Sequence, residues 1–301
     1  MIMKIKLRKM LLGASAGIAG IAIASVAHGQ NILMVTDSGE ESEGTVVSYG
    51  NFLGNAGYNV TISGNYDTGG ADLSSTQINE INSYDLIIFP RLGVTPQQGN
   101  PEDSFFGSNR DWNSISTPLL LHQPFLALSD HDTADSHKGW GWQHHQGSGD
   151  NSEAQRLAVI DPNHSIFDGV AFEDDEGTDF ITMYNEVTPH RRPNSNVDIM
   201  TGTHIADEMD HSFNRVWIHH WDGTESVFYD EADGGRVPGV VGGPRTFFLF
   251  PNTGDINDFT DDGQQVLLNS VAYTIPEPRT YALLFGGVVG LLVFVRRLRK
   301  S

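Results

Sequence analysis

The chain has 301 residues, of which 38 are acidic and 18 basic, so its formal net charge at pH 7 is -20. A field of this sign repels nucleic acid and anionic lipid, which excludes nucleic-acid binding as the function. The chain has no cysteine, so disulfides, thiolate metal sites and a cysteine nucleophile are excluded as well.

Residues 1–29 have the pattern of a secretory signal peptide. Four basic residues within 4–9 precede an apolar stretch over 10–26, and Ala27-His28-Gly29 places small residues at the two positions that signal peptidase reads. We expect cleavage by signal peptidase, with the mature chain beginning near Gln30. An uncleaved N-terminal anchor is the alternative, which the small-residue ending disfavours.

Strand and helix patterns alternate over the next 90 residues. Apolar runs of strand length predict strands over 31–37, 58–63, 84–90 and 117–122. Helical periodicity predicts helices over 41–56 and 73–82, the first ended by Gly57. This alternation predicts right-handed crossovers and a largely parallel sheet covered on both faces.

The segment 128–152 is polar, rich in Gly and Ser, and has no apolar period. A loop of this length inside a compact domain is typically functional or disordered. Together with residues from two strand ends it supplies the possible ligands of a divalent metal. These are His122, Asp130, His131, Asp132, His137, His144, His145, His220 and Asp222.

Imidazole and carboxylate bind zinc, manganese or non-haem iron, and we expect these side chains at the carboxyl edge of the sheet, where α/β folds bind ligands. His219 and His220 point to opposite faces of a strand, so they do not easily serve one ion. No His-Glu-x-x-His spacing is present. Solvated loop histidines are the alternative to a metal centre.

Four tryptophans have two interpretations, stacking on sugar rings or burial in the core. Trp140 and Trp142 lie in the polar loop, where there is little core to fill, and could stack on sugar rings. Trp217 and Trp221 share one face of a predicted strand, so burial against the sheet explains them equally well.

The rest of the domain predicts an added antiparallel layer. Alternating or apolar patterns predict strands over 157–161, 181–184, 197–201, 215–221 and 245–250. Thr260 is expected to cap a final helix over 261–273. No repeat or long linker divides residues 30–275, which we therefore interpret as one domain.

Two further features have a structural and a functional interpretation. His164 either packs and caps the turn after Pro162 or takes part in a site. The acidic runs 173–179 and 255–262 are either solvated faces or oxygen ligands for calcium, although neither fits the spacing of an EF-hand loop.

Residues 276–301 consist of three ordered parts. Pro276-Glu277-Pro278 is followed by an uncharged apolar run over 281–295 and by the basic residues Arg296, Arg297, Arg299 and Lys300. The run is short for a transmembrane helix, but snorkelling arginine stems extend it, and the basic end is expected to be cytoplasmic. The prolines keep the junction extended, as a processing enzyme would need.

This C-terminal segment resembles the PEP-CTERM sorting signal of Gram-negative bacteria. The resemblance implies transient membrane anchoring, cleavage by an exosortase, and delivery to the cell surface or an extracellular polysaccharide matrix. An ordinary tail anchor that is never cut is the alternative.

A second resemblance covers most of residues 31–275. The strand 84–90 (YDLIIFP), the segment 163–170 (NHSIFDGV) and the last strand from Arg245 are similar to ThuA-like domains, members of the class I glutamine amidotransferase-like group. This resemblance implies a flavodoxin-like three-layer sandwich and a link to sugar handling. The turn 122–125, which is expected to replace the nucleophile turn of the amidotransferases, has no Cys or Ser, so glutamine hydrolysis is excluded.

The sequence therefore predicts an exported α/β protein. It has a flavodoxin-like, mostly parallel sheet, an added antiparallel segment, and a C-terminal transmembrane helix. We expect a non-catalytic domain that binds a glycan or another matrix component. The alternative is a metal-dependent enzyme that acts on sugars through the His and Asp side chains at the carboxyl edge.

Overall fold

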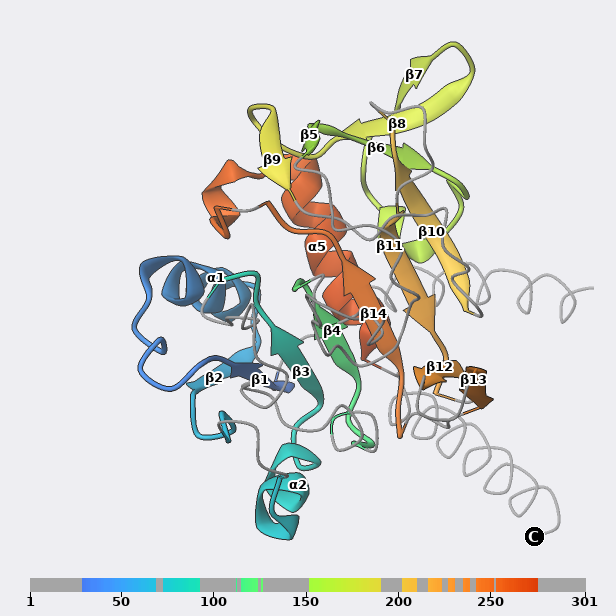
Figure 1. Cartoon of the computed structure of the whole chain (residues 1–301). Helices are drawn as coiled ribbons and strands as arrows, with labels where there is room; N and C mark the ends of the chain where they lie inside the picture. The colour runs from blue at the N-terminus through green and yellow to red at the C-terminus, as the bar shows by residue number, and fades with distance from the viewer. Residues whose placement is uncertain are drawn as a thin grey trace, which may run out of the picture.

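A mixed ten-stranded sheet with few helices forms the centre of the molecule (Figure 1). The computed structural model describes residues 29–68, 73–92, 112, 115–123, 126, 152–190, 202–209, 216–223, 227–230, 235–238, 242–251 and 253–275. Within these residues no helix has the length and apolarity that a bilayer crossing needs. The predicted transmembrane run, 281–295, lies outside them.

One half of the sheet is parallel and follows the predicted strands. Its order is β2-β1-β3-β4-β14, and each neighbouring pair in it is parallel. All described side chains of β3, β4 and β14 are buried, as continuous apolar runs predict for strands covered on both faces. The strands are β1 (Asn31–Val35), β2 (Asn59–Ser63), β3 (Leu86–Phe89), β4 (Leu119–Leu121) and β14 (Arg245–Phe248).

The other half is antiparallel and continues from β14 in the order β11-β10-β6-β8-β7. It equals the parallel half in strand number, so the sheet is mixed where we expected it to be mostly parallel. The predicted strand 197–201 lies outside the described residues. The strands are β6 (Arg156–Val159), β7 (Glu173–Asp175), β8 (Thr178–Thr182), β10 (Thr203–Glu208) and β11 (Val216–Trp221).

Two small two-stranded sheets accompany the large one. Strands β5 (Ser152–Ala154) and β9 (Thr188–His190) form the first, and β12 (Val227–Asp230) and β13 (Gly235–Pro238) form the second. Both are antiparallel, and the sequence patterns had predicted neither.

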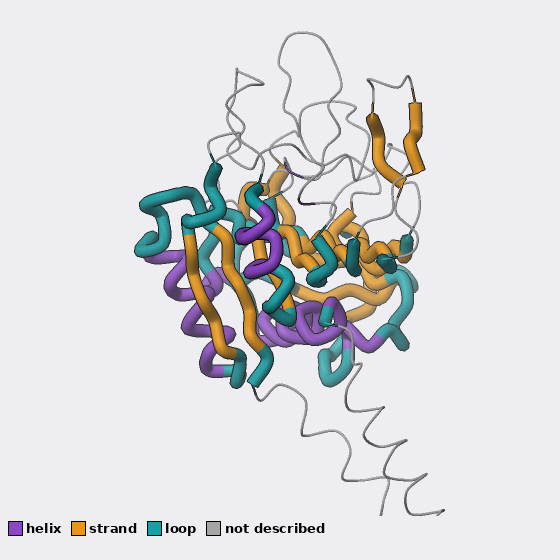
Figure 2. The backbone as a smooth tube through the Cα atoms, turned by 90° about the horizontal axis from the view of Figure 1, so that it is seen from below, coloured by secondary structure: helices purple, strands orange, loops and turns teal. Residues whose placement is uncertain are grey.

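Helices α1 (Gly44–Asn55) and α5 (Asp261–Thr274) cover one face of the sheet (Figure 2). Thr246 and Phe250 point to the same face because side chains alternate along a strand. Thr274 of α5 bonds Thr246 through their hydroxyls at 2.7 Å, and the ring of Tyr49 of α1 lies 5.3 Å from that of Phe250. As predicted, Thr260 caps α5 by accepting a bond from the N–H of Gly263.

Three shorter helical segments are α2, η1 and η3. Helix α2 (Ser75–Ile81) begins with a capping box formed by Ser74 and Gln77. The 3-10 helices η1 (Ser165–Phe167) and η3 (Ile256–Asp258) begin at His164 and Asp255, whose side chains accept from backbone N–H groups two residues further on.

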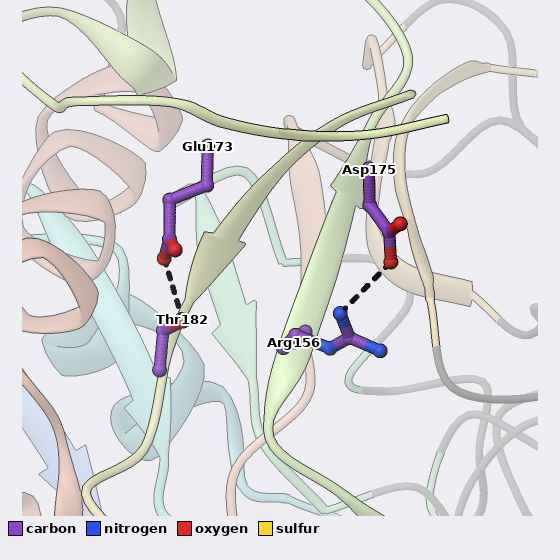
Figure 3. Close-up of polar contacts among 4 residues, drawn as sticks. All are labelled: Arg156, Glu173, Asp175 and Thr182. Atoms are coloured by element: carbon purple, nitrogen blue, oxygen red, sulfur yellow. Dashed lines mark hydrogen bonds and ion pairs between the residues drawn. The ribbon is translucent and has the colours of Figure 1, made fainter. Parts of the chain in front are cut away.

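The acidic run 173–179 forms the β7–β8 hairpin at one edge of the sheet. Glu176 and Gly177 both have positive φ, 54° and 86°, which is the geometry of a two-residue hairpin turn. Glu173 accepts from the Thr182 hydroxyl at 2.9 Å, and Asp175 lies 3.2 Å from the Arg156 guanidinium (Figure 3). The run is therefore a solvated edge strand, whose charge discourages pairing with a second sheet.

Candidate functional site

The strands that follow β1 in the chain are added on opposite sides of it. The chain leaves β1 through α1 to reach β2 on one side, whereas β3 lies on the other side. The carboxyl ends of β1 and β3 therefore form a topological switch point, the place where open α/β sheets bind ligands. Asp37 follows β1, Arg91 follows β3, and His122 and Gln123 follow β4 at this edge.

His122 is fully buried, and both of its ring nitrogens are bonded. Nδ1 lies 3.0 Å from the carbonyl oxygen of Phe248, so it must donate, and Nε2 therefore accepts from the Tyr49 hydroxyl at 2.9 Å. The ring of Phe250 lies 4.7 Å away. Burial lowers the pKa of His122 to about 4. The residue is a neutral core histidine, and it would have to give up the Tyr49 bond to bind a metal ion.

Arg91 and Gln123 join the ends of β3 and β4. Arg91 Nη1 donates to Gln123 Oε1 at 3.2 Å, and Gln123 Nε2 donates to the carbonyl of Arg91 at 3.3 Å. Gln123 is fully buried and Asp37 is nearly so. Sequence reasoning did not select Arg91 or Gln123 as site residues, although their place directly after a buried apolar run is a signal that points to this edge.

The loop between β1 and α1 is held by carboxylates from the chain itself. Glu41 accepts from the N–H groups of Gly39 at 2.9 Å and Gly64 at 3.0 Å. Asp67 accepts from the N–H of Ser38 at 3.1 Å. Hydrogen bonds from the backbone lower the pKa of Glu41, so its carboxylate is charged at neutral pH.

His220 and Asp222 lie at the other edge of the parallel strands. Strand β11 runs antiparallel to β14, and Trp221 pairs with Arg245, the first residue of β14. The expected place of His220 and Asp222 at the carboxyl edge of the parallel strands is therefore wrong. The residues of β11 do not show in which direction the strand runs.

The ring of His220 is engaged within the fold. Its Nδ1 lies 2.8 Å from the Thr246 hydroxyl, its ring packs 4.8 Å from that of Tyr273, and burial lowers its pKa to about 4. His164 packs on Tyr273 at 4.7 Å and accepts from the N–H of Ile166 at 3.3 Å. The interpretation of His164 as a packed, capping residue is confirmed.

The other predicted ligands fall outside the described residues. These are Asp130, His131, Asp132, His137, His144 and His145, together with Trp140 and Trp142 and the sorting residues Pro276, Glu277, Pro278, Arg296, Arg297 and Arg299. In the part of the chain that is described, no three His, Asp or Glu side chains are grouped as ligands of one metal ion. Trp217 and Trp221 are buried, as the sheet interpretation predicted.

The strand order and the helices define this chain as an α/β protein, built on a mixed sheet with one parallel half. No family model matches the chain, and no curated protein is similar to it. The crystal structure of a protein from Bacteroides uniformis, described as ThuA-like, is similar with a TM-score of 0.48 and 10% sequence identity. The similarity covers 86% of this chain and 97% of that one.

Proposed function

We propose that the chain is an exported surface or extracellular-matrix protein, sorted and cleaved by an exosortase, whose α/β domain binds a glycan or another matrix component without catalysis. The observation that carries the proposal is the fixed order of Pro276-Glu277-Pro278, an apolar run over 281–295 and a basic end. An ordinary membrane anchor has no need of the first part.

The position of the domain's last helix supports this proposal. Helix α5 ends at Thr274, and Ile275 is 5% exposed, with its N–H bonded to the carbonyl of Val271. The last buried residue of the described core is therefore Ile275, directly before Pro276. Cleavage at the Pro-Glu-Pro segment would remove none of the side chains that form this core.

The finer fold that we propose is a flavodoxin-like, ThuA-like sandwich related to the class I glutamine amidotransferases. Its support is the strand order β2-β1-β3-β4-β14, which corresponds to the flavodoxin order 2-1-3-4-5. After β4 stand His122 and Gln123, neither of which can act as a hydroxyl or thiol nucleophile. This supports a binding role for the domain.

Cleavage by an exosortase is tested by mass spectrometry of the protein from an exosortase-containing host. We expect material released from the cells to end near Pro276, and the triple variant Pro276→Ala, Glu277→Ala, Pro278→Ala to stay uncut and membrane-bound. Arg279→Lys serves as the control and should be processed normally. Released wild-type protein that still ends at Ser301 would contradict the proposal.

Glycan binding is tested by co-sedimentation of the released protein with the host's exopolysaccharide. We expect the double variant Trp140→Ala, Trp142→Ala to bind about 30-fold more weakly, since stacking is worth roughly 1 kcal/mol for each of the two rings lost. Phe172→Ala removes an aromatic ring that is 36% exposed before β7 and should leave binding unchanged. Binding that disappears with a chelator would instead favour a metal-dependent enzyme.

A further inference from the structure

Backbone N–H groups beside the carboxyl end of β1, on one side of the switch point, are bonded to the protein's own carboxylates. Glu41 bridges two loops, because one oxygen accepts from Gly39 of the β1–α1 loop and the other from Gly64, directly after β2. The next donors are occupied in the same way, Ser38 by Asp67 and the first turn of α1 by Glu43. The Glu41 carboxylate is therefore bound by two N–H donors at the carboxyl edge, those of Gly39 and Gly64, which together form an anion cradle.

Gly64 shows that the backbone is shaped around this carboxylate. A Cβ at Gly64 would lie 2.4 Å from Glu41 Oε1 and 2.8 Å from the carbonyl oxygen of Asp37. Any side chain at position 64 would thus displace the carboxylate or the β1–α1 loop. The absence of a side chain at position 64 thus allows the loop after β2 to approach the β1–α1 loop, with the Glu41 carboxylate between them.

Loops that follow strands at this edge are the usual phosphate-binding places of α/β folds, because their N–H groups attract anions. Here the donors that would hold a phosphate are already bonded. Asp37, nearly buried beside them, adds a further acidic side chain to the same loop. An incoming phosphate or carboxylate would meet negative charge and find no free donor among these groups.

We propose that Glu41 is a specificity-determining residue, which fills an anion cradle at the switch point and excludes phosphorylated and other anionic ligands from it. The cradle itself then takes no phosphate or carboxylate group, and an uncharged sugar is the ligand that we expect at this edge. The choice of a sugar rests on the proposed function. The exclusion of anions does not, so the two ideas can fail separately.

The test is a calorimetric titration of the full-length protein with inorganic phosphate. We expect no saturable binding to the wild type, and binding to Glu41→Ala with a dissociation constant of about 1 mM, at least about tenfold tighter than the wild type. Glu40→Ala removes the same charge from the neighbouring, exposed position and leaves the bonds of Gly39 and Gly64 intact. It should behave as the wild type does.

Three results would overturn the proposal. They are saturable phosphate binding by the wild type, equal gains in both alanine variants, and no gain in a Glu41→Ala protein whose circular dichroism shows it to be folded. If Glu41→Ala does not fold, Glu41→Gln replaces it. Its neutral amide can still accept one of the two N–H bonds, so a gain in phosphate binding is expected there too, and its absence overturns the proposal equally.

Discussion

Replacing Arg245 by methionine is expected to lower the free energy of unfolding by on the order of 3–5 kcal/mol. The side chain is fully buried, and burial lowers its pKa to about 9. Its two terminal nitrogens donate to five backbone carbonyls at 2.7–3.1 Å, which methionine would leave without these donors. The acceptors are the carbonyl oxygens of Trp112, Ile115, Thr117, Gly243 and Pro244.

Urea denaturation followed by circular dichroism measures this loss. Arg156→Met is the matched control, because Arg156 is partly exposed and contacts Asp175 and the ring of Phe180 at the sheet edge. That variant should lose no more than about 1 kcal/mol. Similar losses in the two variants would show that the buried carbonyl network does not stabilise the domain in the way described.

The parallel half of the sheet was predictable because its signal is local. Runs such as Leu86–Phe89 and Leu119–Leu121 are apolar at every position, which is typical of a strand buried on both faces. The caps followed equally local rules, as Thr260 shows. The antiparallel half was less visible. The residues of β7 are all acidic, and those of β10 are mostly polar, so neither sequence contains a strand period that burial would impose.

The candidate site was harder to predict because it depends on contacts between distant residues. His122 was a reasonable ligand by type, but only the fold shows that Tyr49, 73 positions earlier, fills one of its nitrogens. Arg245 was part of a predicted strand, and nothing in its neighbours indicated five carbonyl acceptors. Glu41 belonged to a predicted helix, whereas in the structure it lies before α1 and bonds Gly64 across the loop.

Acidification from pH 6.5 to pH 4 is expected to destabilise the domain through its buried histidines. Folding lowers the pKa of His122 from 6.5 to about 4, so in this range the unfolded chain binds a proton that the folded chain does not. The stabilisation is complete above pH 6.5 and is lost as the pH falls to 4, a loss of about 3 kcal/mol at 1.36 kcal/mol per pKa unit. The lowered pKa of His220 acts in the same direction.

The variant His122→Gln separates this effect from general acid denaturation. A glutamine amide can donate to the Phe248 carbonyl and accept from the Tyr49 hydroxyl, but it does not titrate. Urea denaturation at several pH values should therefore show a shallower loss of stability between pH 6.5 and 4.5 than in the wild type. Carboxylates such as Glu41, whose pKa is lowered, act below this range. Tyr49→Phe keeps the imidazole and should retain most of the wild-type slope, whereas equal slopes for the wild type and His122→Gln would mean that His122 is not the group responsible.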